Sequence, residues 1–88
     1  MPHRRVTVAS KVGLHARPAA LVAKTAAAQA VPVTIAKDGG EPVPAGSLLS
    51  LMTLAAAHGD EVVVAAEGDG AQAAVDAVAD LVASDLDA

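Results

Sequence analysis

The sequence predicts an α+β fold: a two-layer open-faced sandwich in which a four-stranded antiparallel sheet carries three helices on one face. Strand-like and helix-like hydrophobic patterns follow one another in the order βαββαβα, which is typical of two-layer α+β domains. The 88 residues suffice for one domain, so we expect a single domain over residues 1–88. Hydrophobic residues make up 53% of the chain and aromatic residues 0%, so the core must consist of Val, Leu, Ile and Ala.

The first strand and the first helix are separated by a loop. Residues 4–9 (RRVTVA) alternate in hydrophobicity, with Val6 and Val8 on one face, as in a half-buried strand. Residues 10–15 are predicted to form a loop. Pro18 suits the first turn of a helix, where its missing N–H group costs nothing. The buried stripe of this helix is expected to comprise Leu21, Val22, Thr25 and Ala26.

A hairpin is predicted next. Residues 31–37 (VPVTIAK) alternate as a strand, and the stretch Asp38-Gly39-Gly40 is a strong turn signal. The return strand is predicted at residues 41–43. Because Pro42 and Pro44 flank its last residue and lack N–H groups, we expect this strand at an edge of the sheet.

A short helix and a central strand follow. Ser47 is predicted to cap a helix that runs from Leu48 to about Ala56 and is ended by Gly59. Residues 60–67 (DEVVVAAE) are apolar on both faces over their middle, which indicates a central strand.

The last helix is expected to begin at Asp69 or Gly70 and to pack on the sheet through a valine-rich face. Helical spacing places Val75, Val78, Val82 and Leu86 inward, and Asp76 and Asp80 outward. With this element the predicted order is complete.

A histidine and an arginine stand at the start of the predicted first helix, in the stretch GLHARPAA. A helix start presents unpaired N–H groups and the positive end of the helix dipole, so it favours phosphate and other anions. Arg17 adds a permanent guanidinium, and His15 is a natural nucleophile. The positive surroundings are expected to keep the imidazole neutral, the form that attacks a phosphoryl group. The alternative is a loop histidine and a solvated arginine without a role.

GLHARPAA and the later stretch GSLLSLMTLAAAHGDEVVV, in this order and separation, resemble the HPr phosphocarrier family of the bacterial phosphoenolpyruvate:sugar phosphotransferase system. The resemblance implies a carrier, not an enzyme, that uses no cofactor. Phosphorylated enzyme I would phosphorylate His15 on Nδ1, and a IIA domain would receive the phosphoryl group. Arg17 would stabilise the phosphate, with Ala16 and Pro18 in the first-turn site. Val12 stands where members often carry a polar residue near the phosphate.

The resemblance assigns two further features to the predicted short helix. Ser47 matches the serine that is a regulatory phosphorylation site in many members, which would add a serine kinase and phosphorylase as partners. Leu48, Leu49 and Met52 would form an exposed patch that docks enzyme I and the IIA domains, beside Arg17 and Lys24. Leu51 and Leu54 are expected to supply the inward face of the helix.

Two other functions are alternatives to that of a phosphocarrier. One is an HPr-like regulatory module that binds proteins under control of serine phosphorylation; a relative without transfer duty is expected to lack the histidine. The other is a nucleic-acid-binding domain, which the net charge of −4 and the lack of aromatic residues disfavour.

Composition bounds the remaining expectations. No apolar run approaches the ~18 residues of a membrane span, so we expect a cytoplasmic protein without membrane insertion. A phosphocarrier that meets its partners briefly is expected to be a monomer. The chain has no cysteine, and neither His3 nor His58 has ligand-spaced neighbours, so no metal site is predicted.

Overall fold

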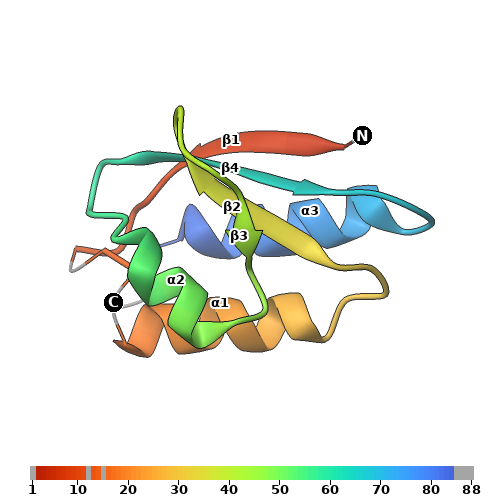
Figure 1. The fold of residues 1–88 in the computed structure, drawn as a ribbon, viewed down its shortest axis with the longest axis horizontal. Helices are drawn as coiled ribbons and strands as arrows, with labels where there is room; N and C mark the ends of the chain where they lie inside the picture. The colour runs from red at the N-terminus through yellow and green to blue at the C-terminus, as the bar shows by residue number, and fades with distance from the viewer. Residues whose placement is uncertain (1, 12, 15, 85–88) are drawn as a thin grey trace.

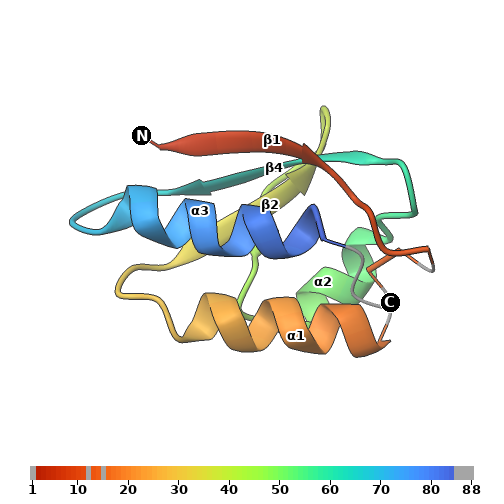
Figure 2. The same ribbon diagram turned by 180° about the vertical axis from the view of Figure 1, so that it is seen from behind.

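Two layers make up the fold, a four-stranded sheet and three helices that cover one of its faces (Figures 1 and 2). The computed structural model describes residues 2–11, 13–14 and 16–84. The elements are, in chain order, β1 (His3–Thr7), α1 (Ala16–Ala27), β2 (Val33–Lys37), β3 (Val43–Pro44), α2 (Leu48–Leu54), β4 (Glu61–Ala66) and α3 (Ala71–Val82). This order confirms the predicted βαββαβα arrangement.

The sheet has the strand order β1-β4-β2-β3, and every neighbouring pair is antiparallel. The predicted central strand, β4, lies between β1 and β2, and the proline-flanked strand, β3, lies at the edge. The predicted bounds of β3 were wrong, because pairing occurs at residues 43–44 and not at 41–43. Val43 pairs with Ile35 and packs against the core, so burial of this valine sets the register.

The core lies between the sheet and the helices and is wholly aliphatic. On β4 the inward side chains Val62 and Val64 are fully buried and alternate with partly exposed ones, since only one face of the sheet is covered. The predicted inward valines of α3, Val75, Val78 and Val82, are buried. Leu86, predicted to join them, lies outside the described residues.

α1 begins at Ala16 and holds Pro18 in its first turn, as predicted. Its buried residues are Pro18, Ala19, Val22, Ala23 and Ala26. The expected stripe was therefore wrong at Leu21, which is 41% exposed, and Thr25 is only half-buried. The helix packs against both α2 and α3, so its buried arc is wide and centred on small alanines that allow close approach.

α2 is shorter than predicted. It begins after the cap at Ser47 but ends at Leu54, where Ala55 takes a left-handed conformation with φ 56°. Its predicted end near Ala56, with Gly59 as the stop, was wrong. The chain turns early because Ala56 is buried, 2% exposed, and its carbonyl accepts a hydrogen bond from the Leu14 N–H group.

β1 is tied to its neighbours by two arginines. Arg4 Nη1 lies 3.3 Å from Asp76 Oδ1 and 2.8 Å from Asp80 Oδ1, both on the outward row of α3. Arg5 Nη1 lies 2.7 Å from Asp38 Oδ1 and 3.3 Å from Glu61 Oε2. These ion pairs raise the pKa of each guanidinium, chiefly through the hydrogen bonds to Asp80 and Asp38 respectively. The two arginines of β1 are thus each paired with two carboxylates.

Candidate functional site

The chain passes from the core to the surface around the predicted phosphorylation site. His15 and Val12 lie outside the described residues, but both neighbours of His15 are described. Leu14 is buried, 2% exposed, whereas Ala16 is exposed and opens α1. The first-turn residues Ala16 and Pro18 are therefore placed at the helix start, Ala16 on the outside and Pro18 packed inward.

The loop before His15 fits closely against the chain that follows α2. The Leu14 N–H group donates to the Ala56 carbonyl at 2.9 Å. Gly13 has φ 73°, and a Cβ atom added there would lie 2.5 Å from the Ala56 oxygen and 2.9 Å from the Ala57 Cα atom. Only glycine fits this position, because a side chain would meet backbone that has no room to move.

The start of α1 offers hydrogen-bond donors to an anion. The first turn of the helix carries no acidic residue. In the first turn of a helix the N–H groups have no partner within the helix, and Pro18 carries no N–H group, so Ala16 and Arg17 supply free donors. Such a set of donors, at the positive end of the helix dipole, suits an oxyanion of a phosphoryl group.

The cations divide into a paired and an unpaired group. Arg4, Arg5 and Lys37 each lie within 4.0 Å of a carboxylate. Within the described part of the chain, no carboxylate lies at ion-pair distance from Lys11, Arg17 or Lys24. Arg17 and Lys24 are exposed on α1 and Lys11 is exposed in the loop before it. Among the described residues, the lysine and arginine side chains without a carboxylate partner therefore lie on α1 and on the loop before it.

Ser47 caps α2 as predicted. Its backbone is extended, with φ −106° and ψ 115°, and its hydroxyl oxygen accepts a hydrogen bond from the Ser50 N–H group at 3.2 Å. The side chain is half-buried. Its role as a phosphorylation site stays a prediction.

The predicted docking patch is exposed as expected. Leu48, Leu49 and Met52 are 42%, 73% and 44% exposed, while Leu51 on the inward face is 0% exposed. Leu54 is partly buried against the core. These three side chains therefore form an exposed apolar patch on α2, and α2 packs against α1, the helix that bears Arg17 (Figure 1).

Leu21 is a further exposed leucine that the sequence reasoning placed in the core. It lies on α1 four residues after Arg17 and three before Lys24, so helical spacing places it on one surface with these two cations. This spacing between two charged residues was the available signal for an outward leucine.

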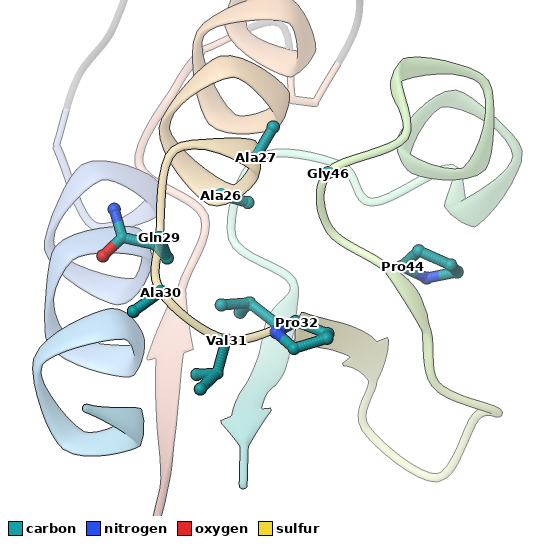
Figure 3. Close-up of a pocket in the computed structure, with 9 residues that line it drawn as sticks. Ala26, Ala27, Gln29, Ala30, Val31, Pro32, Pro44 and Gly46 are labelled. Atoms are coloured by element: carbon teal, nitrogen blue, oxygen red, sulfur yellow. The ribbon is translucent and has the colours of Figure 1, made fainter. Parts of the chain in front are cut away.

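A surface pocket of about 320 Å³ lies at the C-terminal end of α1 (Figure 3). It is lined by Ala26, Ala27, Gln29, Ala30, Val31, Pro32, Val33, Pro44 and Gly46. The lining holds no ionisable side chain, and the Gln29 amide donates to the Thr25 carbonyl at 2.8 Å. None of the predicted site residues lines it, so it has no part in the candidate site.

The described residues hold neither a cluster of metal-ligating side chains nor a membrane-spanning helix. No group of three or more His, Cys, Asp or Glu side chains among them is arranged to hold a metal ion. None of the helices that the structure describes has the length and apolar character needed to cross a membrane.

Comparison with known proteins places the chain in a family. The family model described as "PTS HPr component phosphorylation site" matches residues 2–84. The chain is 48% identical to the phosphocarrier protein HPr of Streptomyces coelicolor, over 99% of this chain and 94% of that protein. It is 40% identical to the HPr-like protein Crh of Bacillus subtilis, over 90% of this chain and 92% of that protein.

A solved structure agrees with these sequence matches. The crystal structure of HPr from Thermoanaerobacter tengcongensis superposes with a TM-score of 0.90 at 35% identity, covering 100% of this chain and 98% of that one. Fold, family model and sequence identity over nearly the whole length lead to the same assignment. The chain belongs to the HPr family of the phosphotransferase system.

Proposed function

We propose that the chain carries a phosphoryl group on His15 from phosphorylated enzyme I to the IIA domains of the phosphotransferase system. As a member of the HPr family it is a phosphocarrier and not an enzyme in the usual sense. The observation that carries the proposal is the family match over residues 2–84, which includes the stretch GLHARPAA. Residues 1–88 would work as one domain, as a cytoplasmic monomer that meets each partner briefly.

The proposed chemistry is a transfer between two nitrogen atoms. The neutral imidazole of His15 attacks the phosphorus through Nδ1; an N–P bond forms on His15 as the N–P bond to the histidine of enzyme I breaks. Nε2 keeps its proton throughout, and the next transfer repeats the exchange toward a IIA domain. Arg17 and the first-turn N–H groups of α1 stabilise the charge on the phosphoryl oxygens. No cofactor takes part.

Docking would use the apolar side of α2 and the free cations beside it. Leu48, Leu49 and Met52 supply a small apolar contact. Arg17 and Lys24, without an acidic partner among the described residues, would pair with acidic groups on enzyme I and the IIA domains. A contact of this size and polarity suits short-lived complexes.

The test is the mass of the intact protein after incubation with phosphoenolpyruvate and enzyme I from the same organism. We expect one added phosphoryl group that is lost in acid, and none on His15→Ala. The variant should keep the circular dichroism spectrum and Tm of the parent chain. A parent chain that gains no phosphate from an active enzyme I would contradict the carrier function.

A regulatory protein-binding function is the second candidate. It is supported by the likeness to Crh and by the exposed apolar side of the helix that Ser47 caps. A phosphate on Ser47 would change the charge of that surface. If His15 gains no phosphate, phosphorylation of the parent chain but not of Ser47→Ala by a serine kinase would favour this function.

A further inference from the structure

The turn of residues 56–60, between α2 and β4, supports the loop that leads into His15. The carbonyl of Ala56 accepts the Leu14 N–H group at 2.9 Å, and Gly13 lies against the same carbonyl. These contacts join segments more than 40 residues apart in the sequence. The backbone just before His15 therefore takes its position from this turn.

The same turn is joined to the end of β1. The Gly59 N–H group donates to the Val8 carbonyl at 3.0 Å, and the Val8 N–H group donates to the Asp60 carbonyl at 2.9 Å. This pair of backbone bonds fixes the far end of the turn to the sheet. Within the turn, the Asp60 N–H group donates to the Ala57 carbonyl at 3.0 Å.

The Asp60 side chain adds a second contact with Ala57, at the end of the turn that meets Gly13 and Leu14. Its Oδ2 atom accepts the Ala57 N–H group at 2.9 Å and lies 3.6 Å from Lys37 Nζ. The hydrogen bond from Ala57 is the main cause that lowers the pKa of the carboxyl; Lys37 acts in the same direction and burial opposes it. The group is thus a carboxylate at neutral pH, a strong acceptor for this backbone donor.

One peptide unit connects the carboxylate to the loop. The Ala57 N–H group, held by Asp60, and the Ala56 carbonyl, which holds Leu14, are the two ends of the same planar peptide. Rotation of that plane would break both hydrogen bonds together. Each bond also polarises the peptide in the sense that strengthens the other.

We infer that Asp60 is a positioning residue for phosphoryl transfer: by fixing the peptide between Ala56 and Ala57, it holds the backbone of Gly13 and Leu14 that leads into His15. The effect on transfer rests on the proposed function. The effect on the loop does not, and it is measurable by itself.

The loop is tested by amide hydrogen exchange in Asp60→Ala, Asp60→Asn and Asp76→Asn. Asp76 is the matched control, because its partly exposed carboxylate pairs with Arg4 far from the loop. We expect exchange at Leu14 to be about tenfold faster in Asp60→Ala. The increase should be smaller in Asp60→Asn, whose amide oxygen still accepts, and absent in Asp76→Asn. Unchanged exchange in Asp60→Ala, or an equal increase in the control, would overturn the inference.

The transfer is tested by single-turnover reaction with phosphorylated enzyme I. The limiting rate for Asp60→Ala should fall about three- to tenfold while the half-saturating concentration is unchanged, because the exposed patch on α2 is intact. A normal limiting rate, or a change in half-saturation alone, would refute the positioning role. If the parent chain itself accepts no phosphate, the proposed function fails, and Leu14 exchange still decides whether Asp60 holds the loop.

Discussion

Ala55 is a single residue in a conformation that its side chain disfavours. With φ 56° and ψ 36° it is the left-handed cap of α2, and its N–H group donates to the Met52 carbonyl. Such a conformation costs an L-residue about 1–2 kcal/mol, and glycine much less. Among the described residues, it is the one non-glycine with a positive φ. Its conformation lets Ala56 turn into the core and meet Leu14.

Ala55→Gly should stabilise the protein. The relief of the left-handed strain exceeds the extra entropy of glycine in the unfolded chain, so we expect a gain of about 0.5–1 kcal/mol in the free energy of unfolding. Chemical denaturation followed by circular dichroism measures it. The control is Ala73→Gly at an exposed position inside α3, which should cost about 1 kcal/mol. A loss of stability in both variants would contradict the left-handed conformation of Ala55.

Asp60 also gives a pH dependence at the residue scale. Because its pKa is lower in the folded chain than in the unfolded chain, ionisation favours folding. Its contribution is complete above the unfolded pKa of about 4 and is lost as the pH falls toward the folded value. The Tm of the parent chain should therefore exceed that of Asp60→Asn at pH ~7, and the difference should shrink at pH ~3. A difference in Tm between the two proteins that stays constant from pH ~7 to pH ~3 would contradict a stabilising role of the ionised Asp60 side chain.

At the scale of elements, the two sides of α2 have different roles: the buried side stabilises the fold, and the exposed side is available for binding. Leu51 is fully buried, whereas Leu49 is 73% exposed two residues earlier. The helix has only seven residues, so its stability depends on the Ser47 cap and on the buried side. The exposed side is free to meet partners at little cost to the fold.

Substitutions on the two sides of α2 should have opposite effects. Leu49→Ser should change the free energy of unfolding by less than about 0.5 kcal/mol and slow phosphoryl transfer from enzyme I about tenfold. Leu51→Ala should lower stability by about 2–5 kcal/mol, while the transfer rate per folded molecule stays normal. Denaturation curves and single-turnover rates separate the two effects. A normal transfer rate for Leu49→Ser would show that Leu49 does not contribute to docking.

Whole-molecule architecture was largely predictable because local patterns agree with it. The apolar run in the middle of residues 60–67 indicated that β4 is a central strand. Pro42 and Pro44 indicated an edge strand, and the valines of α3 followed helical spacing. The predictions were wrong where contacts between distant segments determine which residues are buried and where a helix ends. α2 and α3 cover one side of α1, and Leu21 lies on the other side, exposed to solvent. α2 ends before its predicted end because Ala56 is packed in the core.

The candidate site also has a part that could be predicted from the sequence and a part that could not. Its local part, the stretch around His15 and Arg17 at a helix start, was visible as a motif. Its support was not, because the contact of Leu14 with Ala56 spans a long stretch of sequence. Nothing in the order of the residues says that Asp60 holds the same peptide.

The wholly aliphatic core has a consequence for how this protein is observed. Without indole or phenol groups, the chain contributes no intrinsic fluorescence and almost no absorption in the near ultraviolet. In a mixture with enzyme I or a IIA domain, any tryptophan emission therefore comes from the partner. A partner tryptophan near the contact would report association in real time, free of background and without a dye attached to either protein.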